Sequence, residues 1–289
     1  MKYLALFATA LCALGAFPAE PGHGTLIAHR GESVDAPENT LPAYKTAVER
    51  GFGFECDVYL SKDGRVFTFH DRNLTRTTAG ANTNKCADVT WAELEKVDVG
   101  SWGKWRGSKF AGTRPALLEE VLELACDGRW IYVEVKTGPE IVPHIKKVFD
   151  AQKTATPGNV LFIAINGRTC KALKAQMPEY KVLWLTSAKW LTSAKHRRGE
   201  RKPVTADEIL KEIRNTGADG VEFHYDPKVV SADFIKTIRD AGFEFHVWTV
   251  DDLPNAREAF KRGVQTVATN CANKLLDEYR KTDSARNRP

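Results

Sequence analysis

The stretch Gly53-Phe54-Glu55-Cys56-Asp57-Val58-Tyr59-Leu60 decides the fold, because a short, mostly apolar run of this kind predicts a buried strand. Side chains two residues apart on a strand point to the same side, so Glu55 and Asp57 share one face. Two carboxylates this close repel each other unless a cation lies between them. The stretch therefore predicts oxygen ligands for a divalent cation, with an exposed edge strand carrying solvated acids as the alternative.

Strand-like runs alternate with helical runs on both sides of this stretch, which predicts a parallel sheet built from βα units. The 289 residues suffice for one α/β fold, a TIM (β/α)8 barrel, with a small insertion at 71–115 between strands two and three. The expected strands are 25–29, 54–60, 131–136, 160–165, 181–186, 219–223, 244–249 and 265–269. The expected helices are 41–50, 116–126, 139–151, 168–177, 205–216, 231–241 and 252–262.

The N-terminal residues predict export. Residues 1–19 have a basic start, an apolar core and a small-residue end, which is typical of a signal peptide cleaved near 15–19. The barrel should then occupy 25–280, followed by a flexible polar tail at 281–289. No other segment predicts a membrane span, so we expect a periplasmic or secreted protein without stable membrane insertion.

Composition and cysteine content set wider limits. The formal charge of +5 is compatible with an anionic substrate and does not require nucleic acid. An odd number of cysteines remains after removal of the signal peptide, and the sequence does not fix any pairing. We expect Cys56 to be a buried free thiol, since it points away from Glu55 and Asp57.

Two histidines end apolar runs. His29 follows Leu26-Ile27-Ala28, and His70 follows Val66-Phe67-Thr68-Phe69. Barrel enzymes place catalytic side chains where strands end. Two such histidines, each beside a charged residue, favour a general acid/base pair over packed or capping residues.

A third carboxylate lies in Ile131-Tyr132-Val133-Glu134-Val135-Lys136, where Glu134 and Lys136 share a face. An acid within an apolar strand needs a partner when it is buried, and either a metal ion or Lys136 can provide one. Glu134 is therefore a third candidate ligand, with a simple Glu–Lys ion pair as the alternative.

These motifs resemble the glycerophosphodiester phosphodiesterase family, from about Thr25 to about Ala272. The resemblance is carried by six motifs: HRG at His29–Gly31, PENT at Pro37–Thr40, E-x-D at Glu55 and Asp57, HD-x-x-L-x-R-T-T at His70–Thr78, E-x-K at Glu134 and Lys136, and VWTV at Val247–Val250.

The resemblance implies an enzyme that hydrolyses glycerophosphodiesters, which are small molecules, to an alcohol and sn-glycerol 3-phosphate. It assigns catalysis to His29 and His70, one divalent metal ion to Glu55, Asp57 and Glu134, and substrate contacts to Arg30, Lys136 and Trp248. Ligands that are all oxygen favour Ca²⁺, with Mg²⁺ as the alternative. The sequence leaves the oligomeric state and the head-group preference open.

Several alternatives remain open from the sequence. We expect His29 to act as base and His70 as acid, although the reverse is also compatible with the motifs. Attack by the glycerol 2-hydroxyl, giving a cyclic phosphate, and direct attack by water are equally compatible. The rival functions are a phospholipase D-like or phosphoinositide-cleaving barrel acting on intact lipid, and a non-catalytic phosphodiester-binding barrel.

The C-terminal half departs from the family pattern. Asn270 stands where an acid is expected, and Ala164-Ile165 replaces Ser-Phe; we expect both departures to lie outside the metal and histidine set. A duplicated hexapeptide, residues 184–189 and 190–195, is expected to lengthen the loop after strand five. The loop would lead into five Lys or Arg residues between Lys195 and Lys202, forming either a basic lip that attracts anionic substrates or an ordinary solvated loop.

Overall fold

The computed structural model describes residue 22 and residues 25–126, 128–197 and 203–286. The expected signal peptide therefore lies outside the described residues. The strands are β1 (Leu26–Ala28), β2 (Gly53–Leu60), β3 (Val66–Thr68), β4 (Ile131–Val135), β5 (Val160–Ala164), β6 (Lys181–Thr186), β7 (Gly220–His224), β8 (Glu244–Trp248) and β9 (Val267–Thr269).

The helices have ordinary start and stop signals. Thr205, for example, begins one helix as part of a capping box with Glu208, and Gly217 ends it with a φ of 70°. The α-helices are α1 (Leu41–Glu49), α2 (Trp91–Leu94), α3 (Leu118–Leu122), α4 (Val142–Ala151), α5 (Gly167–Gln176), α6 (Ala188–Arg197), α7 (Ala206–Thr216), α8 (Ala232–Asp240), α9 (Leu253–Lys261) and α10 (Ala272–Arg286). The 3₁₀ helices are η1 (Cys86–Asp88), η2 (Gly103–Trp105) and η3 (Pro139–Ile141).

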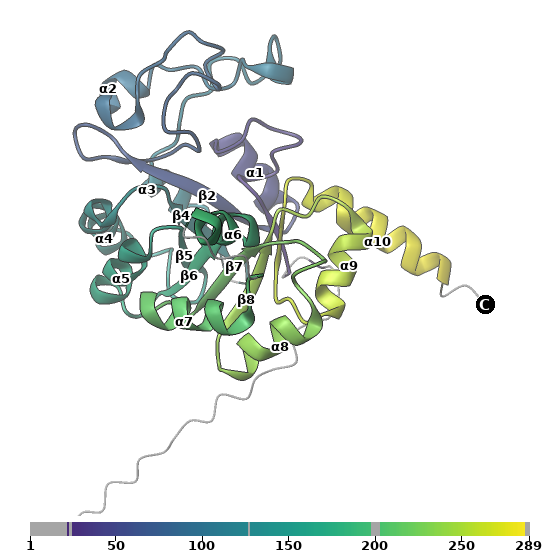
Figure 1. Ribbon diagram of the computed structural model, residues 1–289. Coiled ribbons are helices and arrows are strands. Elements are labelled where there is room, and N and C mark those ends of the chain that lie inside the picture. Colours follow the sequence, from purple (N-terminus) through teal and green to yellow (C-terminus); the bar gives the residue numbers. More distant parts are fainter. Residues whose placement is uncertain (1–21, 23–24, 127, 198–202, 287–289) are drawn as a thin grey trace, which may run out of the picture.

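In the described part of the chain, eight parallel strands close into a barrel. The order is β1-β9-β8-β7-β6-β5-β4-β2, and β1 also pairs with β2 to complete the ring. The helices surround these strands (Figure 1). The predicted TIM barrel and all eight predicted strands are confirmed, with ends that differ by one or two residues.

Two apolar layers hold the barrel together. One fills the barrel interior and includes Ile27, Tyr132, Ile163 and Leu183. The other lies between the strands and the helices, where Cys56 is buried as a free thiol, as expected. Since successive side chains of a strand alternate between these layers, Glu55 and Asp57 point to the opposite side from Cys56.

The segment between β2 and α3 leaves the barrel. β3 pairs antiparallel with β2, an element that the sequence did not predict, and the chain then passes through η1, α2 and η2. This segment lies above the β2 end of the barrel (Figure 1). It has its own apolar cluster, in which Leu74, Cys86 and Leu94 pack with Tyr59 and Phe67 of the β2–β3 hairpin.

One expectation for the secondary structure of the second half of the chain is wrong. The second hexapeptide copy does not lengthen a loop, because it forms most of α6, whereas the first copy begins in β6 and ends in the first residues of α6. The chain is helical as far as Arg286 in α10, which buries Leu275 and Leu276 against the barrel, and the flexibility expected of residues 281–289 stays a prediction. Residues 198–202 of the expected basic lip and residues 287–289 lie outside the described residues.

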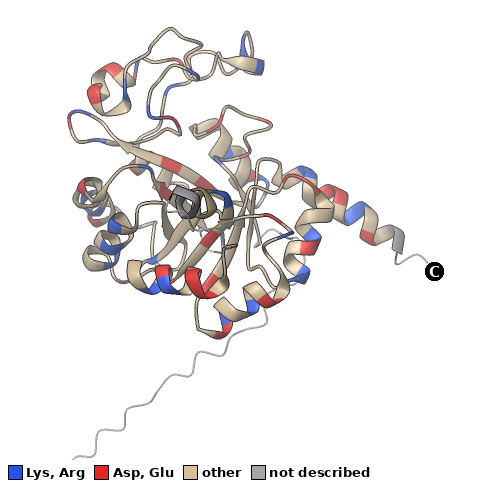
Figure 2. Cartoon of the chain, viewed as in Figure 1, with Lys and Arg blue, Asp and Glu red and all other residues tan. Residues whose placement is uncertain are grey.

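Positive and negative residues alternate over the outer surface of the described chain. Figure 2 shows both signs interspersed along the outer helices, and acidic segments on strands of the barrel. Within the described residues, no helix is both long and apolar enough to cross a membrane. The five cysteines described are all free.

Candidate active site

Three buried carboxylates lie on the neighbouring strands β2 and β4. Asp57 and Glu134 are direct register partners, and Glu55 precedes Asp57 on the same face. Their exposed fractions are 2% for Glu55, 0% for Asp57 and 6% for Glu134. One oxygen from each lies within 4.8 Å of the others, a spacing that a single metal ion can bridge.

The loop after β1 holds this group in place. Asn39 donates from Nδ2 to Asp57 Oδ2 at 2.7 Å and accepts from the Asp57 backbone N–H at 2.9 Å. The Arg30 N–H donates to Glu55 Oε2 at 2.8 Å. Arg30 and Asn39 both have left-handed backbones, with φ of 59° and 55°, an uncommon conformation for non-glycine residues. This strained loop therefore positions two of the three carboxylates.

The residues present fit a divalent cation. Among the described residues, Glu55 Oε1 is buried without a hydrogen-bond partner, so a cation would satisfy an otherwise unpaired oxygen. Burial and repulsion from Asp57 raise the pKa of Glu55 well above its usual range, and burial raises the pKa of Glu134 to about 7. Burial alone would also raise the pKa of Asp57, yet Lys136 and Arg30 hold it below its usual range. This cluster of repelling acids is stabilised by added positive charge.

His29 lies beside the acidic group with a defined tautomer. Asn270 donates from Nδ2 to Asp251 Oδ2 at 2.7 Å, which turns Asn270 Oδ1 toward His29. His29 Nδ1 must then be the donor to this oxygen, at 2.8 Å, and Nε2 carries the lone pair, 3.9 Å from Glu55 Oε2. Burial, with Arg30 beside it, lowers the pKa of His29 to about 4. His29 is therefore neutral at physiological pH and can accept a proton.

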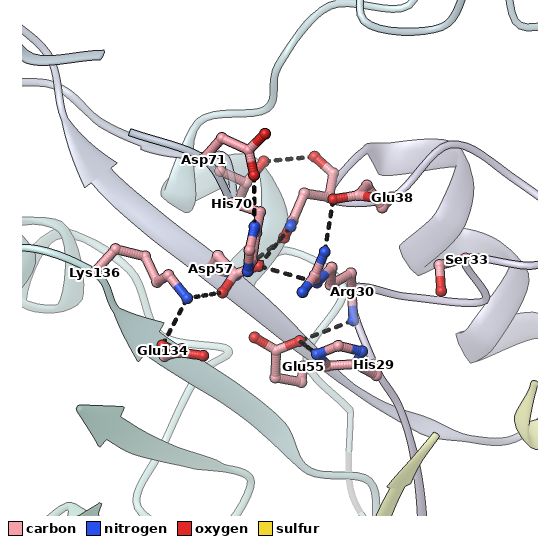
Figure 3. Close-up of polar contacts among 12 residues, drawn as sticks. His29, Arg30, Ser33, Glu38, Glu55, Asp57, His70, Asp71, Glu134 and Lys136 are labelled. Atoms are coloured by element: carbon pink, nitrogen blue, oxygen red, sulfur yellow. Dashed lines mark hydrogen bonds and ion pairs between the residues drawn. The ribbon is translucent and has the colours of Figure 1, made fainter. Parts of the chain in front are cut away.

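His70 lies on the other side of the carboxylates with a different partner. Its Nδ1 donates to Asp71 Oδ1 at 2.7 Å, which leaves Nε2 free. Arg76 donates to Asp71 and also to Glu38. Glu38 in turn accepts from Arg30 (Figure 3). This chain of charged hydrogen bonds connects the two histidine loops. The Asp71 carboxylate orients the imidazole, so that Nε2 is available for proton transfer.

The other predicted residues are placed as follows. Lys136 Nζ lies 2.8 Å from Glu134 Oε1 and 3.1 Å from Asp57 Oδ1, so the suggested Glu–Lys pair is present within the acidic group. Arg30 Nε lies 3.6 Å from Asp57 Oδ2. Trp248 is the last residue of β8, across the barrel from the acidic group. Its ring contacts the rings of His224 and Trp190, rather than His29, His70 or the three buried carboxylates.

A groove leads from His70 toward the insertion. Its volume is about 1170 Å³, and its walls come from the loops after β3, β4 and β5 together with η1. Residues lining it include Tyr59, His70, Arg72, Lys85, Lys136 and Ile165. A cavity this size, open to solvent beside the histidine, has room for a small diester and its variable alcohol.

Sequence reasoning missed three contacts at this site. Asn39 and Asp71 lie inside the PENT and HD motifs, so their positions were signalled but their roles in holding Asp57 and His70 were not. Asn270 was expected to lie outside the histidine set, and this is wrong, because it is the direct partner of His29. No local signal identifies that pair, since 241 residues separate them.

The fold and the site define a (β/α)8 barrel enzyme whose histidines and acids gather at the carboxyl ends of the strands. A model of the glycerophosphoryl diester phosphodiesterase family matches residues 29–274, and the chain belongs to this family.

Known proteins similar to this chain agree with that assignment. A glycerophosphodiester phosphodiesterase of Caldanaerobacter subterraneus subsp. tengcongensis is 30% identical over 260 residues, covering 89% of this chain and 98% of that protein. One from Bacillus subtilis is 29% identical and covers 84% of this chain and 82% of its own length. The solved structure of an Oleispira antarctica phosphodiesterase, in complex with the product sn-glycerol-3-phosphate, has a TM-score of 0.72 and 26% identity over 89% of this chain and 96% of that chain.

Proposed function

We propose that this protein hydrolyses glycerophosphodiesters to an alcohol and sn-glycerol 3-phosphate. The observation that carries the proposal is the pair His29 and His70, each with its Nδ1 hydrogen-bonded and its Nε2 free, on either side of three buried carboxylates. The similarity to named glycerophosphodiester phosphodiesterases over nearly the whole chain supports the same substrate class.

The two histidines differ in the way that acid/base catalysis requires. His29, neutral and bonded to an amide, takes the proton from the attacking oxygen, which belongs either to water or to the glycerol 2-hydroxyl. In the second case, water then opens the cyclic phosphate to give sn-glycerol 3-phosphate. His70, supported by the Asp71 carboxylate, gives a proton to the leaving alcohol oxygen. Arg30 and Lys136 place two positive charges where the phosphate oxygens would lie. Arg30 also forms an ion pair with Glu38, and Lys136 forms ion pairs with Asp57 and Glu134.

Glu55, Asp57 and Glu134 would hold the divalent cation, and all-oxygen ligands favour Ca²⁺, with Mg²⁺ as the alternative. When bound, the ion neutralises charge on the phosphoryl oxygens. We also propose export to the periplasm or the medium, on the support of the N-terminal sequence alone. Cell fractionation with an antibody to the protein tests this, and a purely cytoplasmic signal would contradict it.

The decisive experiment measures release of sn-glycerol 3-phosphate from glycerophosphocholine. We expect activity to disappear after exhaustive chelation and to return with added Ca²⁺. His29→Ala and His70→Ala should each slow turnover by about two to four decades, the usual contribution of a positioned acid or base. The factor by which the double variant is slowed should be smaller than the product of the two single-variant factors, because both residues serve one reaction.

The controls separate the parts of this proposal. His144→Ala removes a histidine that bonds only Gly64 O on the outer surface and should keep wild-type turnover. Undiminished activity of the chelated enzyme would contradict the metal site. Normal kcat in either histidine variant would make that histidine structural.

A further inference from the structure

A fourth carboxyl group is buried inside the barrel and has no role in the site described above. Glu222 lies on β7 with an exposed fraction of 2%. Its register partners are Leu185 on β6 and His246 on β8. Leu185 packs in the barrel interior, and His246 contacts the interior hydroxyl of Tyr132, so Glu222 points into the barrel.

Glu222 differs from the other buried acids in having no partner. Glu55, Asp57 and Glu134 accept hydrogen bonds or form ion pairs, whereas no hydrogen bond or ion pair to the Glu222 side chain occurs among the described residues. The Glu222 carboxyl is therefore available to accept a hydrogen bond from a ligand in the barrel mouth. Burial raises the pKa of Glu222 well above its usual range, and the charges of Glu134 and Asp57 raise it further.

A second unsatisfied polar atom lies one strand away. Trp248 Nε1 is buried without an acceptor among the described residues. Trp248 is the register partner of His224, and the centroids of their rings lie 5.2 Å apart. His224 follows Glu222 by two residues, so both lie on the same face of β7. The barrel mouth therefore presents an unused acceptor, the Glu222 carboxyl, and an unused donor, the Trp248 indole N–H, on adjacent strands.

We propose that Glu222 binds the glycerol end of the substrate by accepting a hydrogen bond from one of its free hydroxyls. The proposal rests on the proposed function and adds the residue that selects the substrate. Two adjacent hydroxyls supply both a donor for Glu222 and an acceptor for Trp248 Nε1. Glycerol then lies toward β7 and β8, and the variable alcohol extends into the groove beside His70.

This arrangement has a consequence for selectivity. A site built to bond a substrate hydroxyl rejects analogues that lack it, because its own polar groups then stay unpaired. Diesters without glycerol hydroxyls should therefore be poor substrates of the wild-type enzyme, and removal of Glu222 should abolish the advantage of glycerol-containing diesters without affecting the histidines.

The test compares two substrates in three variants. Glu222→Ala and the nearly isosteric Glu222→Gln are measured against Glu244→Gln, an acid at the opposite end of the barrel that pairs with Lys181. We expect Glu222→Ala to lower kcat/KM for glycerophosphocholine by about a hundredfold or more, and that for bis(4-nitrophenyl) phosphate by less than about threefold. The kcat/KM of Glu222→Gln for glycerophosphocholine should lie between the values for wild type and Glu222→Ala. Glu244→Gln should have the wild-type kcat/KM for both substrates.

Binding measurements complete the test. Glu222→Ala should weaken binding of sn-glycerol 3-phosphate while leaving the affinities for inorganic phosphate and Ca²⁺ unchanged. Equal losses for both diesters, or weaker Ca²⁺ binding, would overturn the inference in favour of a role at the metal site. An unchanged preference for glycerophosphocholine would overturn it outright. If the wild type cleaves only the nitrophenyl diester, the proposed function fails first, and that result is independent of the variants.

Discussion

At the scale of single residues, Asn270 orients His29, a role that the sequence did not predict. Its amide is fixed by Asp251, and its Oδ1 accepts from His29 Nδ1. An amide has no charge, so it orients the ring without stabilising the protonated form as a carboxylate would. Burial lowers the pKa of His29 to about 4 and Arg30 adds to this shift, whereas the bond to Asn270 acts in the opposite direction.

Asn270→Ala should therefore lower kcat by about ten- to a hundredfold with little change in KM, because His29 loses its orientation but the substrate contacts stay. Asn270→Asp should retain more activity and move the acid limb of the pH–rate profile upward, since a carboxylate raises the pKa of His29. Steady-state kinetics across pH measure both effects.

Ser33→Ala is the matched control for this position, because the Ser33 hydroxyl donates to the same Asn270 oxygen at 3.2 Å without touching His29. The kcat and the pH–rate profile of Ser33→Ala should remain close to those of the wild type. A pH profile that does not move in Asn270→Asp would contradict the assignment of His29 as the group that must be neutral.

At the scale of elements, β2 and β4 hold acids whose protonation opposes metal binding. Glu134 has a pKa of about 7 in the metal-free protein, and that of Glu55 is raised well above its usual range. Both must lose their protons when a cation binds. Affinity for Ca²⁺ should therefore rise with pH through about 7, by up to about tenfold per pH unit for each proton released.

Calorimetric titrations in buffers of different ionisation enthalpy measure both the affinity and the proton release. Glu55→Ala should lose most of the binding, whereas Glu140→Gln, an exposed acid on the η3 side of the groove, should keep the wild-type affinity and pH dependence. An affinity that does not change between about pH 6 and about pH 8 would contradict protonated carboxyls in the metal-free site.

The duplicated hexapeptide provides a second comparison between elements. Trp184, in β6, is buried with an exposed fraction of 8% and donates to Ile165 O, whereas Trp190, in α6, is 41% exposed and contacts Trp248 with its ring tilted by 45°. Trp184→Ala should reduce the free energy of unfolding by about 3–5 kcal/mol, and Trp190→Ala by about 1 kcal/mol or less.

Chemical denaturation of both variants measures these differences, and each serves as the control for the other. Equal losses would mean that Trp190 is buried in solution by contacts that the structure does not describe. An increase in KM in Trp190→Ala, with stability retained, would place the α6 tryptophan at the substrate entrance.

At the scale of the whole molecule, the insertion and the barrel share a boundary. Tyr59 and Phe67 belong to the β2–β3 hairpin, yet they pack in the same cluster as Leu94 of the insertion. Arg76 of the insertion also bonds Glu38 in the loop after β1. The two parts are therefore expected to unfold together.

Leu94→Ala should lower the free energy of unfolding by about 2–5 kcal/mol, the usual cost of a cavity at a fully buried leucine, and should shift a single calorimetric transition. Glu95→Ala, on the exposed side of the same turn, should leave the transition within about 0.5 kcal/mol. Two separate transitions, of which only one moves, would show that the insertion folds on its own.

The sequence alone determined the elements and the local geometry of the site. Alternating apolar runs were sufficient to place eight strands, because strand and helix periodicities are local properties. The spacing of Glu55 and Asp57 was sufficient to place both acids on one face, since a strand repeats every two residues. The motifs around His29 and His70 were sufficient to choose the catalytic candidates.

Only the tertiary structure decided which of these side chains meet. Barrel closure places β9 beside β1, and this brings Asn270 to His29 across 241 residues. The first half of the hexapeptide is a strand in one copy and helical in the other, because burial against the barrel, rather than local propensity, selects the conformation of each copy. Glu222 looked like one acid among many until the closed barrel left it buried without a partner, since burial depends on every surrounding strand at once.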